Sequence, residues 1–440
     1  MTTTPARAPG LLSVEEARDL VLAAIAAPLP AEEVPTDDAL GRVLAAPVVA
    51  ATDLPPWDNS AMDGYAVRAA DTDGATEAAP IRLTVVGDVR AGTAPEASVS
   101  AGVAVRIATG APLPPGADAV IPVEDTTPLD AAGSRGPRGR DATGPLPAAC
   151  LVYVPVAPGA SVRRAGDDLH AGTVVLEPGA ALTPAGIALA AGSGNGRLTV
   201  TRRPRVAVLA TGDEVRPPGA TLGAAGIPDS NGPGLAALAA DAGGEPIRLG
   251  VASDVLDDVL GRLRAAIAEG ADAIVVSGGV SVGPYDVVKL AFDAIGRIDL
   301  WRVAVQPGKP FAFGTADRPG GGPPVLLFGL PGNPVSGFVT FELFVRPALR
   351  RLAGRRDLLR PTDRAVLDEP VSKSHGRRAF LRVVAGGRDA HGRVRVRLAG
   401  GQGSHVLSAL AAADALAIIP EENDSLPAGA EVELWWLDRA

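Results

Sequence analysis

The chain has 440 residues, among them 53 glycines and 41 prolines, and is too long for a single hydrophobic core, so several domains are expected. Its 41 Lys and Arg against 50 Asp and Glu give a formal net charge of −9, and no basic face is evident, which argues against a nucleic-acid partner. One cysteine excludes an internal disulfide, and neither a signal peptide nor an apolar run of spanning length is found, so we expect a cytoplasmic protein with no membrane partner.

Two helices are predicted near the N-terminus. Ser13 and Glu16 have the spacing of a capping box, which opens a helical pattern that runs to about residue 26. A second helical pattern covers residues 36–46. These elements alone indicate packing within a domain and no specific function.

The stretch DNSAMDGYA, residues 58–66, has neither helical nor strand periodicity. Two prolines and Trp57 precede it, so we predict a rigid loop that holds Asp58 and Asp63 in fixed places. An Asx-rich turn without further function is the alternative.

A small β domain is predicted for residues 81–123, which read as short strands and turns and contain RIATGAP. Residues 126–149 consist mostly of Gly, Pro, Ala, Arg and Asp, a composition that cannot bury a core and predicts a mobile surface insertion. The following RRAGDD, residues 163–168, is by itself typical of a surface turn with local ion pairs.

Three short β-branched runs in the middle of the chain are each followed by a glycine-rich loop. Residues 205–210 lead into TGDE, residues 273–276 into SGGVSVG, and residues 324–330 into PGNPVS, with helical patterns opening at Asp286 and over residues 337–349. Repeated strand–loop–helix units predict a doubly wound α/β domain with these loops at the carboxyl ends of parallel strands. The three loops are therefore expected to line one crevice.

The residue types in these loops suit an anion and a hard cation. Glycine loops followed by helix starts bring backbone N–H groups close to a phosphate or another oxyanion. Glu214 and Asp286 lie at the rims, and with one cysteine and four histidines in the chain Mg²⁺ is favoured over zinc or copper. Arg302 and Lys309, in WRVAVQPGKP, would add positive charge. Any one loop alone is equally explained as a tight βα turn.

The C-terminal part is predicted to be a small β-barrel. Alternating runs at residues 394–398 and 431–437 are separated by turn clusters. The loop GQGSH, residues 401–405, could be a strand connection or part of a site, and no nucleophile–base–acid triad is apparent.

Five motifs in order, DNSAMDGYA, TGDE, SGGVSVG, PGKPFAFG and GLPGNPVS, resemble the molybdopterin molybdenumtransferase family, which includes MoeA and the gephyrin E domain. The resemblance covers about residues 11–437. It implies a multidomain α/β fold with a doubly wound, molybdopterin-binding type central domain at 201–350 and a C-terminal β-barrel domain at 358–440. Residues 1–200 would form an elongated N-terminal α+β dimerisation domain with an inserted small β domain at about 55–165.

The resemblance also implies a reaction and partners. Adenylylated molybdopterin would be bound, its pyrophosphate link hydrolysed with Mg²⁺, and molybdate transferred to the dithiolene, releasing AMP and the molybdenum cofactor. The chain would be a homodimer in which the Asp63 loop of one subunit covers the crevice of the other. Molybdopterin adenylyltransferase and molybdoenzyme maturation proteins are candidate partners. The alternative is a catalytically weak homologue that acts as a molybdopterin-binding scaffold.

Site residues follow from matching the family motifs to this sequence. The catalytic carboxylates would be Asp63, Glu214, Asp254 and Asp286, of which Glu214, Asp254 and Asp286 would hold the metal. Asp254 is equally explained as a helix N-cap. Substrate binding would involve Thr109, Arg163, Asp168, Ser277, Gly278, Gly279, Ser281, Arg302, Lys309, Pro331, Gly332, Asn333 and Ser336. Molybdate would be held by Gln306, Lys309, Ser336, Arg377 and Ser404.

Gln306 departs from the family pattern, because many relatives carry Lys at this position. The change removes a positive charge expected near molybdate and puts molybdate affinity in doubt, unless Arg302 supplies the charge instead.

Overall fold

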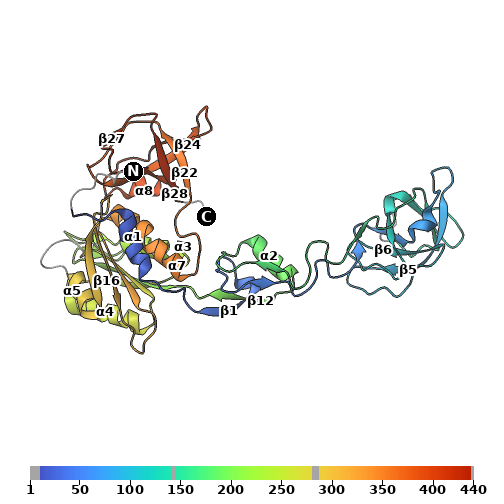
Figure 1. Ribbon diagram of the computed structural model, residues 1–440, viewed down its shortest axis with the longest axis horizontal. Coiled ribbons are helices and arrows are strands. Elements are labelled where there is room, and N and C mark those ends of the chain that lie inside the picture. The colour runs from blue at the N-terminus through green and yellow to red at the C-terminus, as the bar shows by residue number, and fades with distance from the viewer. Residues whose placement is uncertain (1–9, 140–143, 280–286, 438–440) are drawn as a thin grey trace, which may run out of the picture.

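The computed structural model describes residues 10–139, 144–279 and 287–437, so the predicted site residues Ser281 and Asp286 lie outside the described residues. The molecule is elongated (Figure 1), with the central domain and the C-terminal barrel at one end and a small β domain at the other. A narrow middle segment containing α2 connects them. The predicted multidomain fold is confirmed.

The central domain is built on a six-stranded sheet in the order β16–β13–β17–β21–β20–β18. The first four strands are mutually parallel and the last two are antiparallel additions. The strands are β16 (Glu245–Ala252), β13 (Arg205–Thr211), β17 (Ala273–Ser277), β21 (Val325–Leu330), β20 (Pro310–Ala316) and β18 (Arg297–Arg302). The three predicted strand–glycine-loop units are thus neighbours in one sheet.

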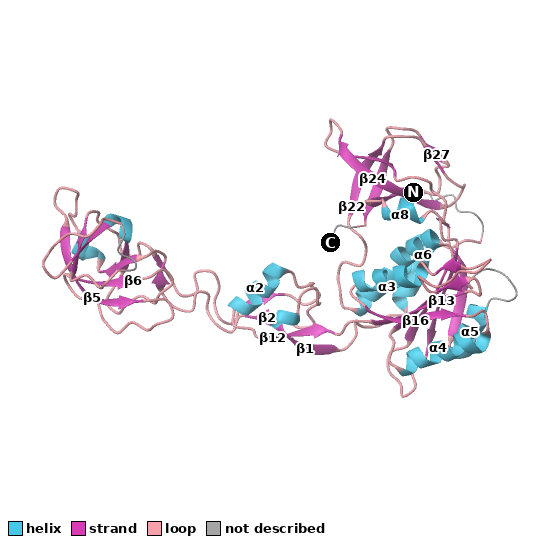
Figure 2. Ribbon diagram, turned by 180° about the vertical axis from the view of Figure 1, so that it is seen from behind, coloured by secondary structure: helices cyan, strands magenta, loops and turns pink. Residues whose placement is uncertain are grey.

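Helices cover both faces of this sheet, as the predicted doubly wound fold requires (Figure 2). Successive strand residues alternate between the faces: Val206 and Val208 join one core, while Ala207 and Leu209 join the other. The first face packs against α1 (Val14–Ala23), α3 (Asn231–Asp241), α6 (Pro334–Thr340), η4 (Phe341–Val345) and α7 (Arg346–Leu352). The second packs against α4 (Leu256–Ala268) and α5 (Val287–Ile295).

A closed five-stranded barrel forms the C-terminal region, as predicted. Its strands follow the order β24–β25–β22–β28–β26, and β26 pairs back with β24. They are β22 (Thr362–Leu367), β24 (Arg378–Arg388), β25 (Val394–Leu398), β26 (Ala415–Ile419) and β28 (Glu431–Trp436), with α8 (Leu407–Ala411) between β25 and β26. Inward residues such as Leu381 fill the barrel, whereas Phe380, Ile418 and Trp435 face outward into the core shared with the central domain.

The capping box at the start of α1 is confirmed, because Ser13 Oγ accepts from Glu16 N at 3.0 Å and Glu16 Oε2 accepts from Ser13 N at 2.7 Å. The second helix predicted for residues 36–46 is wrong. Only η1 (Thr36–Asp38) is helical there, and Gly41 then adopts a φ of +71°, which a helix cannot continue through.

The middle segment consists of short paired strands and one helix. Its strands are β1 (Ala31–Pro35) with β12 (Arg197–Thr201), and β2 (Val48–Val49) with β11 (Val174–Leu176); its helix is α2 (Pro184–Gly192).

The small β domain has a six-stranded sheet in the order β7–β4–β6–β5–β9–β8. These strands are β4 (Gly64–Val67), β5 (Ile81–Val89), β6 (Val103–Ile107), β7 (Ala119–Pro122), β8 (Thr126–Leu129) and β9 (Ala149–Val152); β3 (Asn59–Ser60) pairs separately with β10 (Val162–Arg163). Residues 58–66 are therefore not free of regular structure, since β3 and the start of β4 flank a turn.

The surface insertion predicted for residues 126–149 is wrong at both ends. β8 and β9 pair with each other, and Leu129, Ala149 and Tyr153 share a small buried core. β-strand pairing, which composition does not report, brings these ends into the domain.

None of the helices in the described ranges combines the length and apolar character needed to cross a membrane.

Candidate active site

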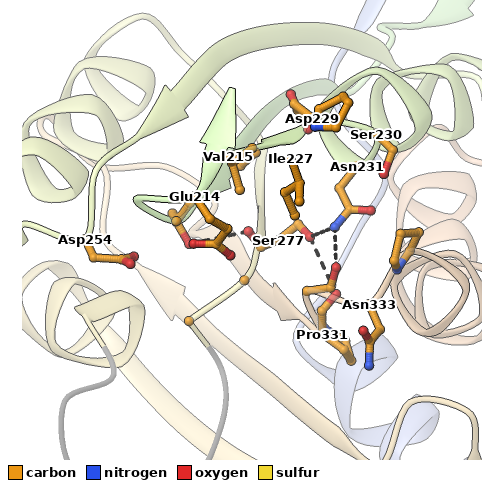
Figure 3. A pocket seen from close by; sticks show the side chains of 18 of the residues that line it. Glu214, Val215, Ile227, Asp229, Ser230, Asn231, Asp254, Ser277, Pro331 and Asn333 are labelled. Atoms are coloured by element: carbon orange, nitrogen blue, oxygen red, sulfur yellow. Dashed lines mark hydrogen bonds between the residues drawn. The ribbon is translucent and has the colours of Figure 1, made fainter. Parts of the chain in front are cut away.

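An open pocket of about 1220 Å³ lies at the carboxyl ends of β13, β17 and β21 (Figure 3). The parallel registers pair Ala210 with Ser277 and Ser277 with Leu330, so the three glycine loops emerge side by side. The predicted residues that line the pocket are Glu214, Asp254, Ser277, Gly278, Gly279, Pro331, Gly332 and Asn333. The crevice expected from the sequence is thus present.

Gly278 allows the first two loops to approach closely. Its φ is +99°, and a Cβ at this position would lie 2.8 Å from the carbonyl oxygen of Thr211. Its N–H donates to Leu330 O at 3.1 Å and so also fixes the end of β21. A side chain here would meet both backbone strain and a clash with backbone.

Asn231, at the start of α3, joins two loops of the pocket and was not predicted. Its Nδ2 donates to Ser277 Oγ and to Gly332 O, both at 2.7 Å (Figure 3). The Ser277 hydroxyl is buried and lies 3.5 Å from Pro331 O. This side chain therefore links the SGG and PGN loops, in addition to the pairing of β17 with β21.

Asp229 fixes the helix start that carries Asn231. The residue is 4 % exposed, and its carboxylate accepts from Gly232 N at 2.7 Å and pairs with Arg248 at 3.2 Å. The signal that sequence reasoning missed is the polar triplet Asp-Ser-Asn immediately before the helical pattern of α3.

Glu214 and Asp254 are exposed carboxylates at the rim of the pocket (Figure 3). Asp254 and Asp213 hold each other: Asp213 N donates to Asp254 Oδ2 at 3.2 Å, and Asp254 N donates to Asp213 Oδ1 at 3.1 Å. α4 begins at Leu256 with no side-chain cap, so the N-cap interpretation of Asp254 is wrong.

The carboxylates that the structure describes do not by themselves form a metal cage. No group of three His, Cys, Asp or Glu side chains among the described residues is arranged to hold a metal ion. Mg²⁺ ordinarily takes one or two carboxylates together with phosphate oxygens and water. Glu214 and Asp254 fit that donor set.

The cationic stretch before PGKP lies mostly outside the lining of the pocket. Of residues 301–310 only Pro310 is part of the described lining, and Arg302 is exposed at the end of β18. Gln306 Oε1 accepts from Ser374 N at 2.9 Å, so this side chain contacts the segment that precedes β24. Lys309 is half-buried, and its carbonyl accepts from Val303 N at 3.0 Å.

The remaining residues predicted to bind molybdate do not line the pocket in the part that is described. Ser336 is buried in α6, and Arg377 is half-buried just before β24. Ser404 O accepts from Val335 N of α6 at 3.0 Å, and the next residue, His405, does line the pocket. The barrel loop thus contacts the helix that follows the PGN loop.

The structure places Asp63, Thr109, Arg163 and Asp168 in or beside the small β domain, at the opposite end of the chain from the pocket (Figure 1). Thr109 donates to Asp63 Oδ1 from its backbone N at 2.7 Å and from its hydroxyl at 2.9 Å. All four residues, Asp63, Thr109, Arg163 and Asp168, are exposed. Within one chain this group does not meet the pocket.

Asp58 anchors the other side of the Asp63 loop. Its carboxylate accepts from Ala165 N at 2.9 Å and from Arg164 at 2.6 Å. The backbone N–H of Ala165, followed by Arg164, lowers the pKa of Asp58 below its usual value. These contacts support the predicted rigidity of the loop.

Comparison with known proteins places three family models along the chain. The MoeA N-terminal region (domain I and II) matches residues 12–194, a probable molybdopterin binding domain matches 207–351, and the MoeA C-terminal region (domain IV) matches 364–437.

The chain is similar to curated proteins and to a solved structure over most of its length. It is 40 % identical over 408 residues to molybdopterin molybdenumtransferase 2 of Mycobacterium tuberculosis, covering 91 % of this chain and 94 % of that one. It is 33 % identical over 429 residues to molybdopterin molybdenumtransferase of Haemophilus influenzae, covering 96 % and 98 %. The crystal structure of a molybdopterin biosynthesis MoeA protein from Pyrococcus horikoshii superimposes with a TM-score of 0.75 at 34 % identity, covering 97 % and 99 %.

Proposed function

This chain belongs to the MoeA family of molybdopterin molybdenumtransferases, and from that premise we propose that its pocket inserts molybdate into adenylylated molybdopterin, releasing AMP and the molybdenum cofactor. The observation that carries the proposal is the pairing of two glycine loops through Asn231 in the same pocket as the carboxylates Glu214 and Asp254. Glycine loops suit a pyrophosphate, and rim carboxylates suit the cation that accompanies it.

The groups of this chain would bind and orient the pyrophosphate. Gly278 and Gly332 carry no side chain, so substrate oxygens can come close to the backbone of both loops. The start of α3 lines the same pocket, and its dipole favours negative charge. Mg²⁺ held by Glu214 and Asp254 would stabilise charge that develops on the phosphate oxygens.

We extend the proposal to a homodimer with shared sites. Asp63 and Thr109 form one exposed, hydrogen-bonded unit, yet they lie at the far end of their own chain from the pocket (Figure 1). A second copy in the opposite orientation would bring this unit to the pocket of the first. The proposal predicts that Asp63→Ala and Glu214→Ala, each inactive alone, recover activity when mixed and refolded, because one site of the heterodimer then carries neither change. Verified heterodimers without recovered activity would contradict shared sites.

The function is tested by incubating the protein with adenylylated molybdopterin, Mg²⁺ and molybdate and following AMP release and cofactor formation. We expect turnover by the wild type and at least a hundredfold loss in Glu214→Gln, a size typical of losing a group that acts electrostatically at the reacting centre. The matched control is Asp368→Asn, which removes an exposed carboxylate paired with Arg395 in the barrel. Binding of adenylylated molybdopterin without turnover by the wild type would support the scaffold alternative instead.

A further inference from the structure

Arg382, in β24, is buried with none of its side chain exposed. In this strand Leu381 and Val383 point into the barrel, whereas Phe380 points outward into the core shared with the central domain. Arg382 is two residues from Phe380 in the strand, so its side chain points to the same face. It pairs across the sheet with Leu416, another residue of the shared core. Its guanidinium therefore lies on the outer face of the barrel, where the barrel meets the central domain.

The guanidinium has no counter-charge among the described residues. In the described part of the chain the guanidinium makes two hydrogen bonds, both donated by NH2. The acceptors are the carbonyl oxygens of Gly401 at 2.9 Å and Gly403 at 3.1 Å. Nε and NH1 are buried and have no hydrogen-bond partner in the described part of the chain. Burial lowers the pKa of Arg382, and no charged neighbour opposes that effect.

Gln402 completes the attachment of the loop to β24. Its Oε1 accepts from Arg382 N at 2.9 Å, and its Nε2 donates to Arg382 O and to Gly400 O, both at 3.0 Å. Side chain and backbone of Arg382 together thus hold residues 400–403. The same loop continues to Ser404, which contacts Val335 of α6, and to His405, which lines the pocket.

The stability of the barrel does not explain an arginine at this position. A buried guanidinium without a counter-charge loses its hydration and gains little in return, and an apolar side chain of similar volume is often as stable or more so. Because burying the Arg382 guanidinium costs free energy that its contacts do not return, we infer that the arginine serves the pocket and not the stability of the barrel.

We propose that Arg382 is a positioning residue for the oxyanion substrate: it fixes the loop of residues 400–405 against the pocket wall and leaves an unneutralised positive charge beneath it. The inference rests on the proposed function and on the predicted role of Ser404 in binding molybdate, whereas the SGG and PGN loops and Glu214 would serve the pyrophosphate. Arg382 itself does not touch substrate. It acts through Ser404 and His405.

The test compares Arg382→Met, which keeps the volume and removes the charge, with Arg382→Lys, which keeps the charge on a shorter and more strongly hydrated group that reaches less far toward Gly401 O and Gly403 O. The control is Arg397→Met, an exposed arginine of the same barrel. Cofactor formation is measured against molybdate and against adenylylated molybdopterin separately, together with Tm. We expect the molybdate half-saturation concentration to rise tenfold or more in Arg382→Met and about threefold in Arg382→Lys. The KM for adenylylated molybdopterin and the Tm should stay at the level of the control.

Equal loss of affinity for both substrates, or a lowered Tm with unchanged molybdate dependence, would overturn the proposal and leave Arg382 as a structural residue. If Arg382→Met does not fold, Arg382→Lys decides, and an unchanged molybdate half-saturation in that variant overturns the proposal. A wild type that forms no cofactor at all would instead refute the proposed function, so the two failures are distinguishable.

Discussion

Replacing Asn231 by Ala should separate the two loops that the proposed pyrophosphate site requires. The variant loses both 2.7 Å hydrogen bonds from Nδ2, one to the buried Ser277 hydroxyl and one to Gly332 O. A hydrogen bond contributes about 0.5–1.5 kcal/mol net, so the two together contribute about 1–3 kcal/mol. With about 2–4 °C per kcal/mol for a domain of this size, a loss near 2 kcal/mol lowers Tm by about 4–8 °C.

The effect on turnover should exceed the effect on stability. Ser277 and Gly332 belong to different loops, and a misplacement of about 1 Å between groups that bind one substrate can reduce the rate by roughly a hundredfold. Thermal unfolding and AMP release are measured on the same preparation of Asn231→Ala, at a temperature well below its Tm. We expect turnover to fall ten- to a hundredfold in a protein that is still fully folded.

Asn195→Ala is the matched control, since Asn195 Nδ2 also donates to a carbonyl and to a serine hydroxyl, but in the middle segment of the molecule. The acceptors are Val49 O at 3.0 Å and Ser193 Oγ at 3.2 Å, with a longer third bond to Ser193 O at 3.5 Å. This change should lower Tm by a similar amount and leave turnover unchanged. If Asn231→Ala keeps wild-type turnover in spite of a lowered Tm, the bridge stabilises the fold only, and the reasoning about loop separation is wrong.

Three further changes test separate parts of the structure. Gly278→Ala should destabilise the central domain by about 2–5 kcal/mol in denaturant titration, because a left-handed backbone and a clash with a carbonyl add together, whereas Gly92→Ala, with φ +83° and open space, should show the backbone penalty alone. Gln306→Lys should lower the molybdate half-saturation concentration roughly tenfold, the ratio equivalent to about 1.4 kcal/mol, and an unchanged or higher value would show that the missing charge is already compensated. Because the folded pKa of Asp58 is lowered, its stabilisation is complete above the usual aspartate pKa of about 3.9 and is lost as pH falls through the folded pKa. The Tm difference between wild type and Asp58→Asn should therefore shrink below about pH 4, and a constant difference would mean that the carboxylate charge of Asp58 does not stabilise the fold through Ala165 N–H and Arg164.

Features encoded within a few neighbouring residues were predictable from the sequence. The capping box of Ser13 and Glu16 and the strand–glycine-loop units of the central domain depend on local pattern, and all of them are present. Residues 36–46 also had a local helical pattern, but Gly41 in a left-handed conformation and pairing of Val43 and Leu44 with distant residues end the helix after one turn. Tertiary pairing overrode propensity there.

The less predictable features depend on partners far along the chain. Asn231 contacts residues 46 and 101 positions away, and nothing in its neighbourhood reveals those partners. Arg382 lies in a strand where a charged residue of its parity would ordinarily face water, and it is buried only because the outer face of the barrel packs on the central domain. Arg302 and Gln306 do not belong to the described lining of the pocket, and their roles in binding stay predictions.

The narrow middle segment makes the small β domain the end of a lever. The chain leaves the central domain through β1 and returns through β12, and a ladder of only five residue pairs, Ala31 with Thr201 through Pro35 with Arg197, joins the two passes. Two-stranded ribbons twist readily, and any rotation at this ladder is multiplied along the length of the molecule before it reaches Asp63 (Figure 1). The accuracy with which Asp63 could be delivered to another subunit is therefore set by the stiffness of a short ribbon that carries none of the chemistry.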